Sequence, residues 1–188
     1  MKNVLTLSFI LFACTSLNAQ VELAHLSSKG FSATGFGAFL HAGGFVSDAD
    51  EIGGDAALYF FSANDSHIAF APILATWRHS LNRTGAGIYL EPVLGYTFGG
   101  TDIQKTDAAG NPLVNSAGKE VDQKVNGFTA GLGFGYIIPS AVIPLNIGLR
   151  YEHIFVSGDP SLNNISLRLS YSLIIGKRMG GQSPAQAR

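Results

Sequence analysis

The 188-residue sequence contains little cysteine and little charge, and both shortages narrow the class of protein it encodes. A single cysteine excludes a disulfide-built scaffold and a zinc module with several cysteine ligands. Charged residues make up 13% of the chain, about half of the roughly 25% usual in soluble domains. The formal net charge of −1 leaves no excess of basic residues for nucleic-acid binding. These shortages favour a membrane or secreted protein and exclude nucleic acid as a partner.

Residues 1–19 have the pattern of a secretory signal peptide. Lys2 precedes an apolar stretch, and the segment ends in small residues at Ala19, where cleavage is expected. A competing interpretation is a lipobox that ends at Cys14, which would then carry an acyl chain. Beyond this segment no stretch approaches the roughly 20 apolar residues that a membrane-spanning helix needs. The remaining apolar residues lie in short pieces, so any further membrane crossing must use strands.

Large apolar residues alternate with small or polar ones along the chain, clearly so in residues 88–98, 127–138, 145–155 and 165–175. A period of two is typical of a β-strand. Segments of about 11 residues exceed the usual soluble strand of 5–6 and fit a tilted crossing of the bilayer. Aromatic residues near segment ends, as in the girdles of membrane barrels, are Trp77, Tyr96, Phe98 and Tyr136. A membrane β-barrel is therefore expected, with a soluble secreted barrel or sandwich as the alternative.

The alternating segments predict an all-β, eight-stranded, up-and-down antiparallel transmembrane barrel over residues 20–176. Six strands are expected at 55–62, 67–79, 86–99, 126–138, 144–156 and 163–175. Residues 21–46 supply two more, broken near Ser27–Gly30 or His41–Gly44. Short periplasmic turns are expected at 80–84 and 139–141, and surface loops at 100–125 and 157–162. A 16-stranded porin would need about 144 residues or more in strands alone, so a large diffusion pore is excluded.

The segments "LEPVLGYTFGG", "GLGFGY" and "LRLSYSL" give the chain a resemblance to a family of small bacterial barrels. It resembles the small outer-membrane β-barrel proteins of OmpA and OmpX type, in particular those of Bacteroidetes. That resemblance implies a monomer in the outer membrane of a Gram-negative bacterium, in contact with its lipid, with a structural or surface-interaction role. It implies no cofactor and, for most members, no enzymatic activity. The chain departs from the family at its end, because a polar tail over 177–188 follows the last strand.

Four charged residues are predicted to face the lumen and to pair there, because unpaired charges in a narrow interior are unfavourable. They are Glu91, Arg150, Glu152 and Arg168. We expect them to form an ion-pair network that plugs the barrel, with a gated, narrow ion path as the alternative. Arg78, by contrast, is grouped with Trp77 and His79 in a membrane-interface cluster at a strand end.

A catalytic alternative rests on His153 and Ser157, in the segment "RYEHIFVSGDPSLNN". This segment resembles that of outer-membrane lipid A deacylases, in which a serine follows the histidine by two residues and an acidic residue comes later. Here Phe155 occupies that serine position and no glutamate follows Glu152. We therefore expect His153 to be an interfacial histidine and the protein not to be an enzyme. The five histidines lie too far apart for a metal-binding spacing, so no metal is expected.

The long polar segment 100–125 is the expected place for contact with an extracellular or surface ligand. Turn-forming sequences in it indicate an exposed hairpin that continues the flanking strands. Its predicted contact residues are Asp102, Lys105, Asp107, Lys119 and Glu120. Because charges of both signs are present, they indicate no particular ligand class.

Overall fold

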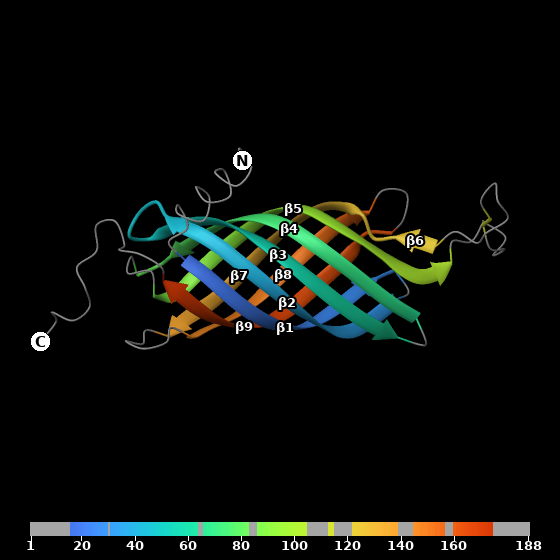
Figure 1. Ribbon diagram of the computed structural model, residues 1–188, viewed down its shortest axis with the longest axis horizontal. Coiled ribbons are helices and arrows are strands. Elements are labelled where there is room, and N and C mark those ends of the chain that lie inside the picture. The colour runs from blue at the N-terminus through green and yellow to red at the C-terminus, as the bar shows by residue number, and fades with distance from the viewer. Residues whose placement is uncertain are drawn as a thin grey trace, which may run out of the picture.

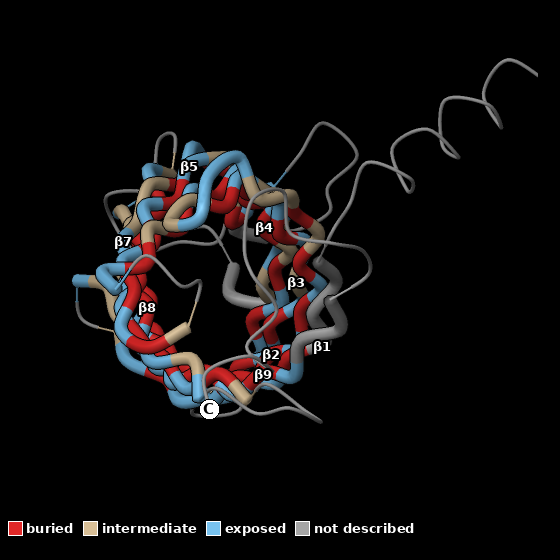
Figure 2. Tube along the Cα trace, turned by 90° about the vertical axis from the view of Figure 1, so that its left-hand side faces the viewer, coloured by how far each residue is buried: buried red, intermediate tan, exposed pale blue. Residues whose placement is uncertain are grey.

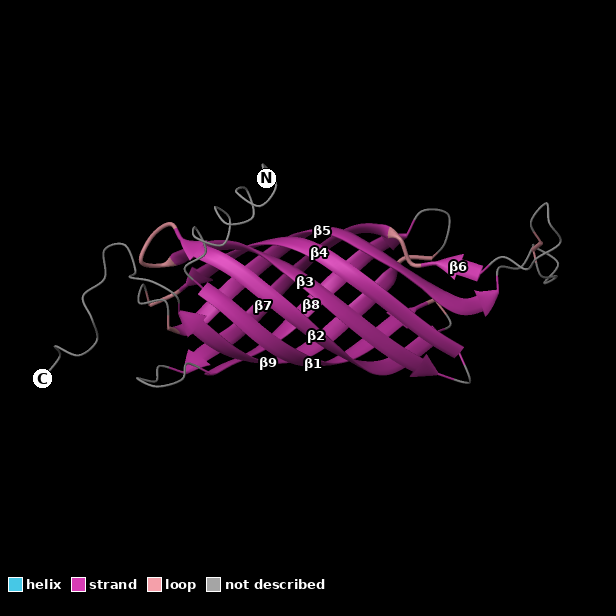
Figure 3. Cartoon of the chain, in the orientation of Figure 1, coloured by secondary structure: helices cyan, strands magenta, loops and turns pink. Residues whose placement is uncertain are grey.

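The computed structural model describes residues 16–29, 31–63, 66–82, 86–104, 113–114, 122–138, 145–156 and 160–174. The regular elements in these ranges are strands (Figure 3). They are β1 (Ser16–Ser28), β2 (Phe31–Phe45), β3 (Asp50–Ala63), β4 (Ser66–Ser80), β5 (Gly87–Gln104), β6 (Asp122–Lys124), β7 (Gly127–Ile138), β8 (Leu145–Val156) and β9 (Leu162–Ile174). Within the described ranges, no helix has the length and apolar character required to cross a membrane.

The strands form one closed antiparallel barrel (Figures 1 and 2). Each long strand pairs with its neighbours along the chain, β9 pairs with β1, and the pairing of β4 with β5 completes the ring. The three-residue β6 pairs only with β5 and continues that strand's hydrogen bonding outside the ring. Eight strands therefore make the wall, which confirms the predicted eight-stranded up-and-down barrel.

The antiparallel order divides the connections between the two ends of the barrel. The start of β1 and the end of β9 share one end with the connections that follow β2, β4 and β7; we call it the terminal end. The connections after β1, β3, β5 and β8 share the opposite end, which we call the loop end. The strands joined by the expected short turns therefore meet at the terminal end, and the strands joined by the expected surface loops meet at the loop end. Of the two break points predicted in residues 21–46, the first occurs, between β1 and β2.

Several element boundaries differ from the sequence prediction. β1 begins at Ser16, so its first four residues lie within the segment 1–19 that is predicted to be removed as a signal peptide. β3 begins at Asp50, five residues before the predicted start at Asp55, because a tight turn precedes it. In this turn Ser47 Oγ accepts hydrogen bonds from the backbone N–H groups of Ala49, at 3.1 Å, and Asp50, at 2.9 Å. The predicted loop 100–125 is in part strand, since β5 continues to Gln104 and pairs with β6. Polar residues dominate this extension, so it lacks the apolar alternation by which strands are recognised.

Exposed and buried residues alternate along the strands of the barrel (Figure 2), and many of the exposed residues are large and apolar. The four aromatic residues predicted to form girdles are all exposed there. So are bulky aliphatic side chains from every wall strand, among them Leu23, Leu40, Ile73, Leu94, Leu132, Leu149 and Leu167. An apolar surface of this extent is unfavourable in water and suits the hydrocarbon core of a bilayer.

Glycines on the inner face of β7 make room for large side chains from β5. A Cβ atom added at Gly135 would lie 2.5 Å from the hydroxyl oxygen of Tyr89, and one added at Gly133 would lie 3.3 Å from Glu91 Cβ. A larger residue at Gly135 would therefore collide with Tyr89. Side chains of β5 therefore occupy the space over the glycine face of the "GLGFGY" segment.

Candidate functional site

The half of the lumen nearer the terminal end holds a cluster of buried ionisable side chains, which we call the lumen network. Its members come from β1, β2, β3, β4, β5, β8 and β9, and each is at most 5% exposed. They are Glu22, His41, Glu51, Asp55, Arg78, Glu91, Arg150, Glu152 and Arg168. Charged side chains so deeply buried are unfavourable unless they are paired, and loss of one partner is strongly destabilising, so the contacts within this cluster are described one by one.

Glu91 lies at the centre of the lumen network and is fully buried. Its Oε2 accepts hydrogen bonds from Arg78 Nε at 2.8 Å and Arg78 Nη2 at 2.5 Å. Its Oε1 accepts from Arg150 Nη2 at 2.5 Å and from Arg168 Nη1 at 2.6 Å. Three guanidinium groups, from β4, β8 and β9, thus converge on one carboxylate from β5. Such charge-assisted bonds are about twice as strong as neutral ones and tie distant strands together across the lumen.

Each of these arginines also contacts a second carboxylate. Arg78 Nη1 lies 3.0 Å from Glu51 Oε2, Arg150 Nη2 lies 2.5 Å from Asp55 Oδ2, and Arg168 Nε lies 2.8 Å from Glu22 Oε1. The guanidinium groups therefore link Glu91 to the carboxylates of β1 and β3. The result is a continuous ion-pair network across the lumen.

Aromatic rings pack against the same three guanidinium groups. The Arg168 guanidinium lies 4.0 Å from the centre of the Phe39 ring, and that of Arg150 lies 5.5 Å from it. The Arg78 guanidinium lies 4.8 Å from the centre of the Tyr89 ring. A cation over a ring face is attracted by the ring quadrupole, so these rings support the buried positive charges as well as filling space.

His41 lies between two carboxylates. Its Nδ1 is 2.6 Å from Asp55 Oδ1, and its Nε2 is 3.3 Å from Glu51 Oε1. Because an ionised carboxylate only accepts hydrogen bonds, this geometry needs protons on both ring nitrogens or on one of the carboxyl groups. The lumen network holds five carboxylates and three guanidinium groups, so a protonated His41 also reduces its excess of negative charge.

The structure brings three of the four predicted lumen residues into direct contact, since Arg150 and Arg168 both bind Glu91. Glu152 is more loosely held: its Oε1 lies 3.4 Å from Arg150 Nη1, and its Oε2 accepts a 3.0 Å hydrogen bond from Asn164 Nδ2. Sequence reasoning missed the network residues Glu22, His41, Glu51, Asp55 and Arg78. Their inward direction follows from strict alternation along β1 to β4, which the many small residues of these strands obscure.

The predicted membrane-interface cluster is corrected at Arg78. Trp77 and His79 face outward, but Arg78 lies between them in β4 and therefore points into the lumen. Asp50 takes its place in the outer cluster. Asp50 Oδ1 accepts a 3.0 Å hydrogen bond from Trp77 Nε1 and lies 2.8 Å from His79 Nδ1. Three consecutive residues cannot share one face of a strand, because successive side chains point to opposite sides.

Nearer the loop end, the lumen is filled by apolar side chains, which we call the apolar layer. Its buried members are Ala24, Leu26, Ala33, Tyr59, Phe61, Ile68, Phe70, Val125, Ile154 and Leu162. The ring centres of Tyr59 and Phe70 are 5.1 Å apart, and those of Phe61 and Phe70 are 5.4 Å apart. The Tyr59 hydroxyl donates a hydrogen bond to Glu22, so this side chain joins the apolar layer to the lumen network. The alternation in the sequence did not predict this layer.

Polar atoms close to the terminal end have fewer partners. Within the part of the chain that the structure describes, the side-chain polar atoms of Gln20, Thr76 and Ser170 near this end are buried and make no hydrogen bond to protein. Gln20 and Ser170 are opposite each other in the β1–β9 register. Buried polar groups require partners, so we expect water to enter the lumen from this end and to stop at the lumen network.

The remaining predicted residues lie outside the lumen or outside the described residues. His153 is half-buried on the outer face, with Nδ1 2.8 Å from Asn163 Oδ1 and its ring against the edge of Phe155 at 4.3 Å. Ser157 lies outside the described residues, as do the predicted contact residues Lys105, Asp107, Lys119 and Glu120. Asp102 belongs to β5 by its backbone, and its side chain is likewise outside the description. Among the residues that are described, no three histidine, cysteine or acidic side chains are grouped so that they could hold a metal ion.

No family model matches the chain, and no curated protein matches it. Solved structures do match. Neisserial surface protein A superimposes with a TM-score of 0.58 and 18% identity, over 85% of this chain and 96% of that one. Ail, the attachment invasion locus protein of Yersinia pestis, solved with the heparin analogue sucrose octasulfate, superimposes with a TM-score of 0.56 and 14% identity, over 84% of this chain and 97% of that one. At such low identities these similarities establish the barrel fold.

Proposed function

We propose that the protein is a monomeric outer-membrane barrel with a closed lumen, which acts structurally or through surface contacts and not as an enzyme. The observation that carries this proposal is the combination of an apolar outer face with a lumen crossed by the Glu91 ion pairs. The signal-peptide pattern of residues 1–19 supports export. The barrel fold shared with a bacterial surface protein and an attachment protein supports a position in the outer membrane.

A closed lumen is favoured by the size of the barrel and by its contents. An eight-stranded barrel has an interior just wide enough for side chains to fill. Here the lumen network crosses one half and the apolar layer fills the other, so an ion would have to break buried ion pairs and then cross an apolar region. We propose that the protein conducts no steady ion current. The narrow-channel alternative would require both layers to open.

Contact with a surface ligand is proposed for the segment 100–125. β5 pairs with β4 as far as Thr101 and then continues to Gln104, where it pairs with β6. The two strands thus carry the start and the end of this segment beyond the rim of the barrel, as Figure 1 shows at the end where β6 is labelled. A ligand approaching the loop end would meet this hairpin first.

Cell fractionation, followed by electrophoresis of boiled and unboiled samples, tests the main proposal. We expect the protein in the outer-membrane fraction, with a band that shifts on boiling because an intact barrel resists detergent. Sequencing of the mature N-terminus tests cleavage after Ala19. A soluble protein whose band does not shift on boiling would overturn the proposal and favour the secreted barrel.

Single-channel recording in planar bilayers tests the closed lumen. We expect no large, steady conductance from the wild-type protein, and we expect Arg150→Ala to destabilise the barrel more than it changes conductance. A stable Arg150→Ala variant with a large, steady current would contradict the plug.

The lipid A deacylase alternative is tested by mass spectrometry of lipid A from cells that express the wild-type protein or His153→Ala. We expect the two lipid profiles to be identical.

A further inference from the structure

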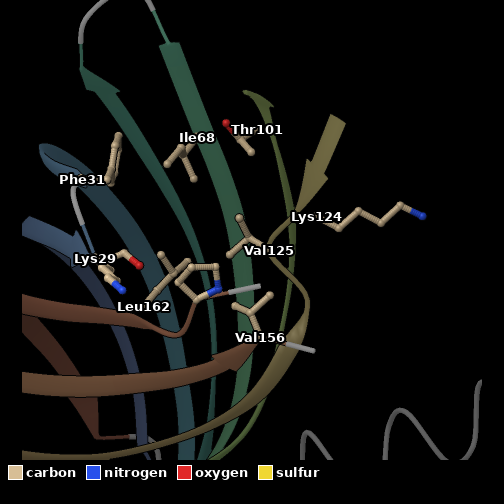
Figure 4. A pocket seen from close by; sticks show the side chains of 10 residues that line it. Lys29, Phe31, Ile68, Thr101, Lys124, Val125, Val156 and Leu162 are labelled. Carbon is tan, nitrogen blue, oxygen red and sulfur yellow. The ribbon is translucent and has the colours of Figure 1, made fainter. Parts of the chain in front are cut away.

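The loop end of the lumen contains a hollow of about 300 Å³ above the apolar layer (Figure 4). Its apolar lining comes from four parts of the barrel: Phe31 of β2, Ile68 of β4, Val125 beside β6, and the β8–β9 region with Val156, Pro160 and Leu162. Ile68, Val125 and Leu162 also belong to the apolar layer, so this layer forms the floor of the hollow. A hollow with an apolar floor is therefore present at the end of the lumen where the surface loops are expected.

The polar residues of the hollow are positively charged or already engaged. Ser28 Oγ donates a 2.9 Å hydrogen bond to the backbone oxygen of Ser161. Lys29 lies on one side of the hollow and Lys124 on the other, with the Lys124 side chain pointing away from the floor (Figure 4). Both lysines are exposed, and neither has a hydrogen-bond or ion-pair partner among the described residues. The described lining contains no acidic side chain.

We propose that this hollow binds a single-chain amphiphilic anion, of which a medium-chain carboxylate is the simplest example. The alkyl chain would lie on Val125 and Leu162, and the carboxylate would lie at the rim near Lys29, with the flexible stem of Lys124 able to turn toward it. A volume of about 300 Å³ is at the lower end of the range for ligand pockets. It suits one chain and is too small for a two-chain lipid.

The charge arrangement is what distinguishes this ligand from others. A neutral apolar molecule would gain from the floor alone, whereas an anion gains from the floor and from two lysines that lack a described counter-charge. A cation would meet like charge at the rim. This proposal goes beyond the structural and surface role proposed above, because it assigns a small-molecule site at the mouth of the lumen. Thr101, Lys124 and Val125 at the two ends of the segment 100–125 line this site, whereas the predicted surface-contact residues of that segment do not enter the argument.

Binding of carboxyl-¹³C-labelled decanoate to the full-length mature protein in phospholipid nanodiscs tests the proposal, with the carboxyl NMR signal as the readout. Nanodiscs replace detergent, which is itself a single-chain amphiphile and would compete. Empty nanodiscs give the non-saturable partition of decanoate into lipid. We expect a saturable component only when the protein is present, and weaker binding of decanol, which keeps the chain and lacks the charge.

Two variants locate the site. The double variant Lys29→Ala/Lys124→Ala should weaken decanoate binding about tenfold, as expected for the loss of two exposed charge contacts. Val125→Trp should remove the saturable component by filling the hollow. Lys177→Ala is the matched control, because Lys177 follows β9, which ends at the opposite end of the barrel; its binding should equal that of the wild type. Retention of the boiling-dependent gel shift verifies that each variant is folded.

Three results would overturn the proposal. One is the absence of saturable binding above empty nanodiscs. Another is equal decanoate binding by the wild type and the double lysine variant, which would leave only an apolar site. A third is binding that emerges only after Leu113→Ser/Val114→Ser, because these two exposed apolar residues of the long connection would then be the natural occupants of the hollow.

Discussion

Toward the terminal end, the lumen of this barrel is crossed by five carboxylates, three guanidinium groups and His41, whereas toward the loop end it is packed with aliphatic and aromatic side chains. The first half is held by directional contacts between charges, and each contact depends on the presence of a partner. The second half is held by close packing, in which the volume of each side chain matters. One narrow interior is thus closed in two physically different ways, and substitutions can separate their contributions to stability.

The largest effect is expected at the centre of the lumen network. Glu91→Gln removes the carboxylate on which three guanidinium groups converge and should lower the free energy of unfolding by about 3–5 kcal/mol, because buried charges lose their partner. Urea unfolding in lipid vesicles, followed by the gel shift of the folded form, measures this change. Glu152→Gln is the matched control, because Glu152 is equally buried but its contact with Arg150 is longer, at 3.4 Å. Since the network has more carboxylates than guanidinium groups, loss of the Glu152 charge should be less costly. Equal losses in the two variants would contradict a network centred on Glu91.

The apolar layer should respond to lost volume. Leu26→Ala, at a fully buried position, should lower the free energy of unfolding by about 3 kcal/mol, through lost apolar contact and a residual cavity. Leu23→Ala on the same strand is the control, because Leu23 is 59% exposed on the outer face, where lipid can fill the space. The same urea titration compares the two variants. If Leu23→Ala were the more damaging, stability would depend on the outer face and not on the apolar layer.

Tyr59 tests the border between the two halves. Tyr59→Phe keeps the ring that packs on Phe70 and removes the hydroxyl that donates to Glu22. It should lower the free energy of unfolding by about 1–2 kcal/mol, because a buried acceptor loses its donor. Tyr151→Phe removes an exposed hydroxyl that donates to Asn163 and should have a much smaller effect. A Tyr59→Phe variant as stable as the wild type would show that the two halves are energetically separate.

The smallest effect is expected outside the lumen. Asp50→Asn leaves an amide oxygen that can still accept a hydrogen bond from Trp77 Nε1, in an exposed cluster at the terminal end. We expect no measurable change in the urea midpoint and only a small shift in the fluorescence of Trp77, the one tryptophan of the chain. A large loss of stability would mean that the outer cluster at the terminal end, and not only the lumen, holds the barrel together.

The clarity of alternation in each strand decided which residues of the candidate site could be predicted. β5, β8 and β9 alternate bulky apolar with polar residues, so the inward direction of Glu91, Arg150 and Arg168 could be inferred. In β1 to β3 many positions are Gly, Ala or Ser, which suit either face. The acidic partners Glu22 and Asp55 therefore could not be assigned to the lumen.

By itself, the sequence determined the class of fold, because a period of two in long apolar segments without a spanning helix is satisfied in a membrane only by a closed barrel. It also determined three of the charges that meet inside. Only the tertiary structure decided which carboxylate those charges share, and that Leu26, Phe61 and Phe70 fill the lumen. The physical reason is that hydropathy separates the two faces of a strand only when one face is polar. Pairing across the lumen depends on the register and closure of all eight strands.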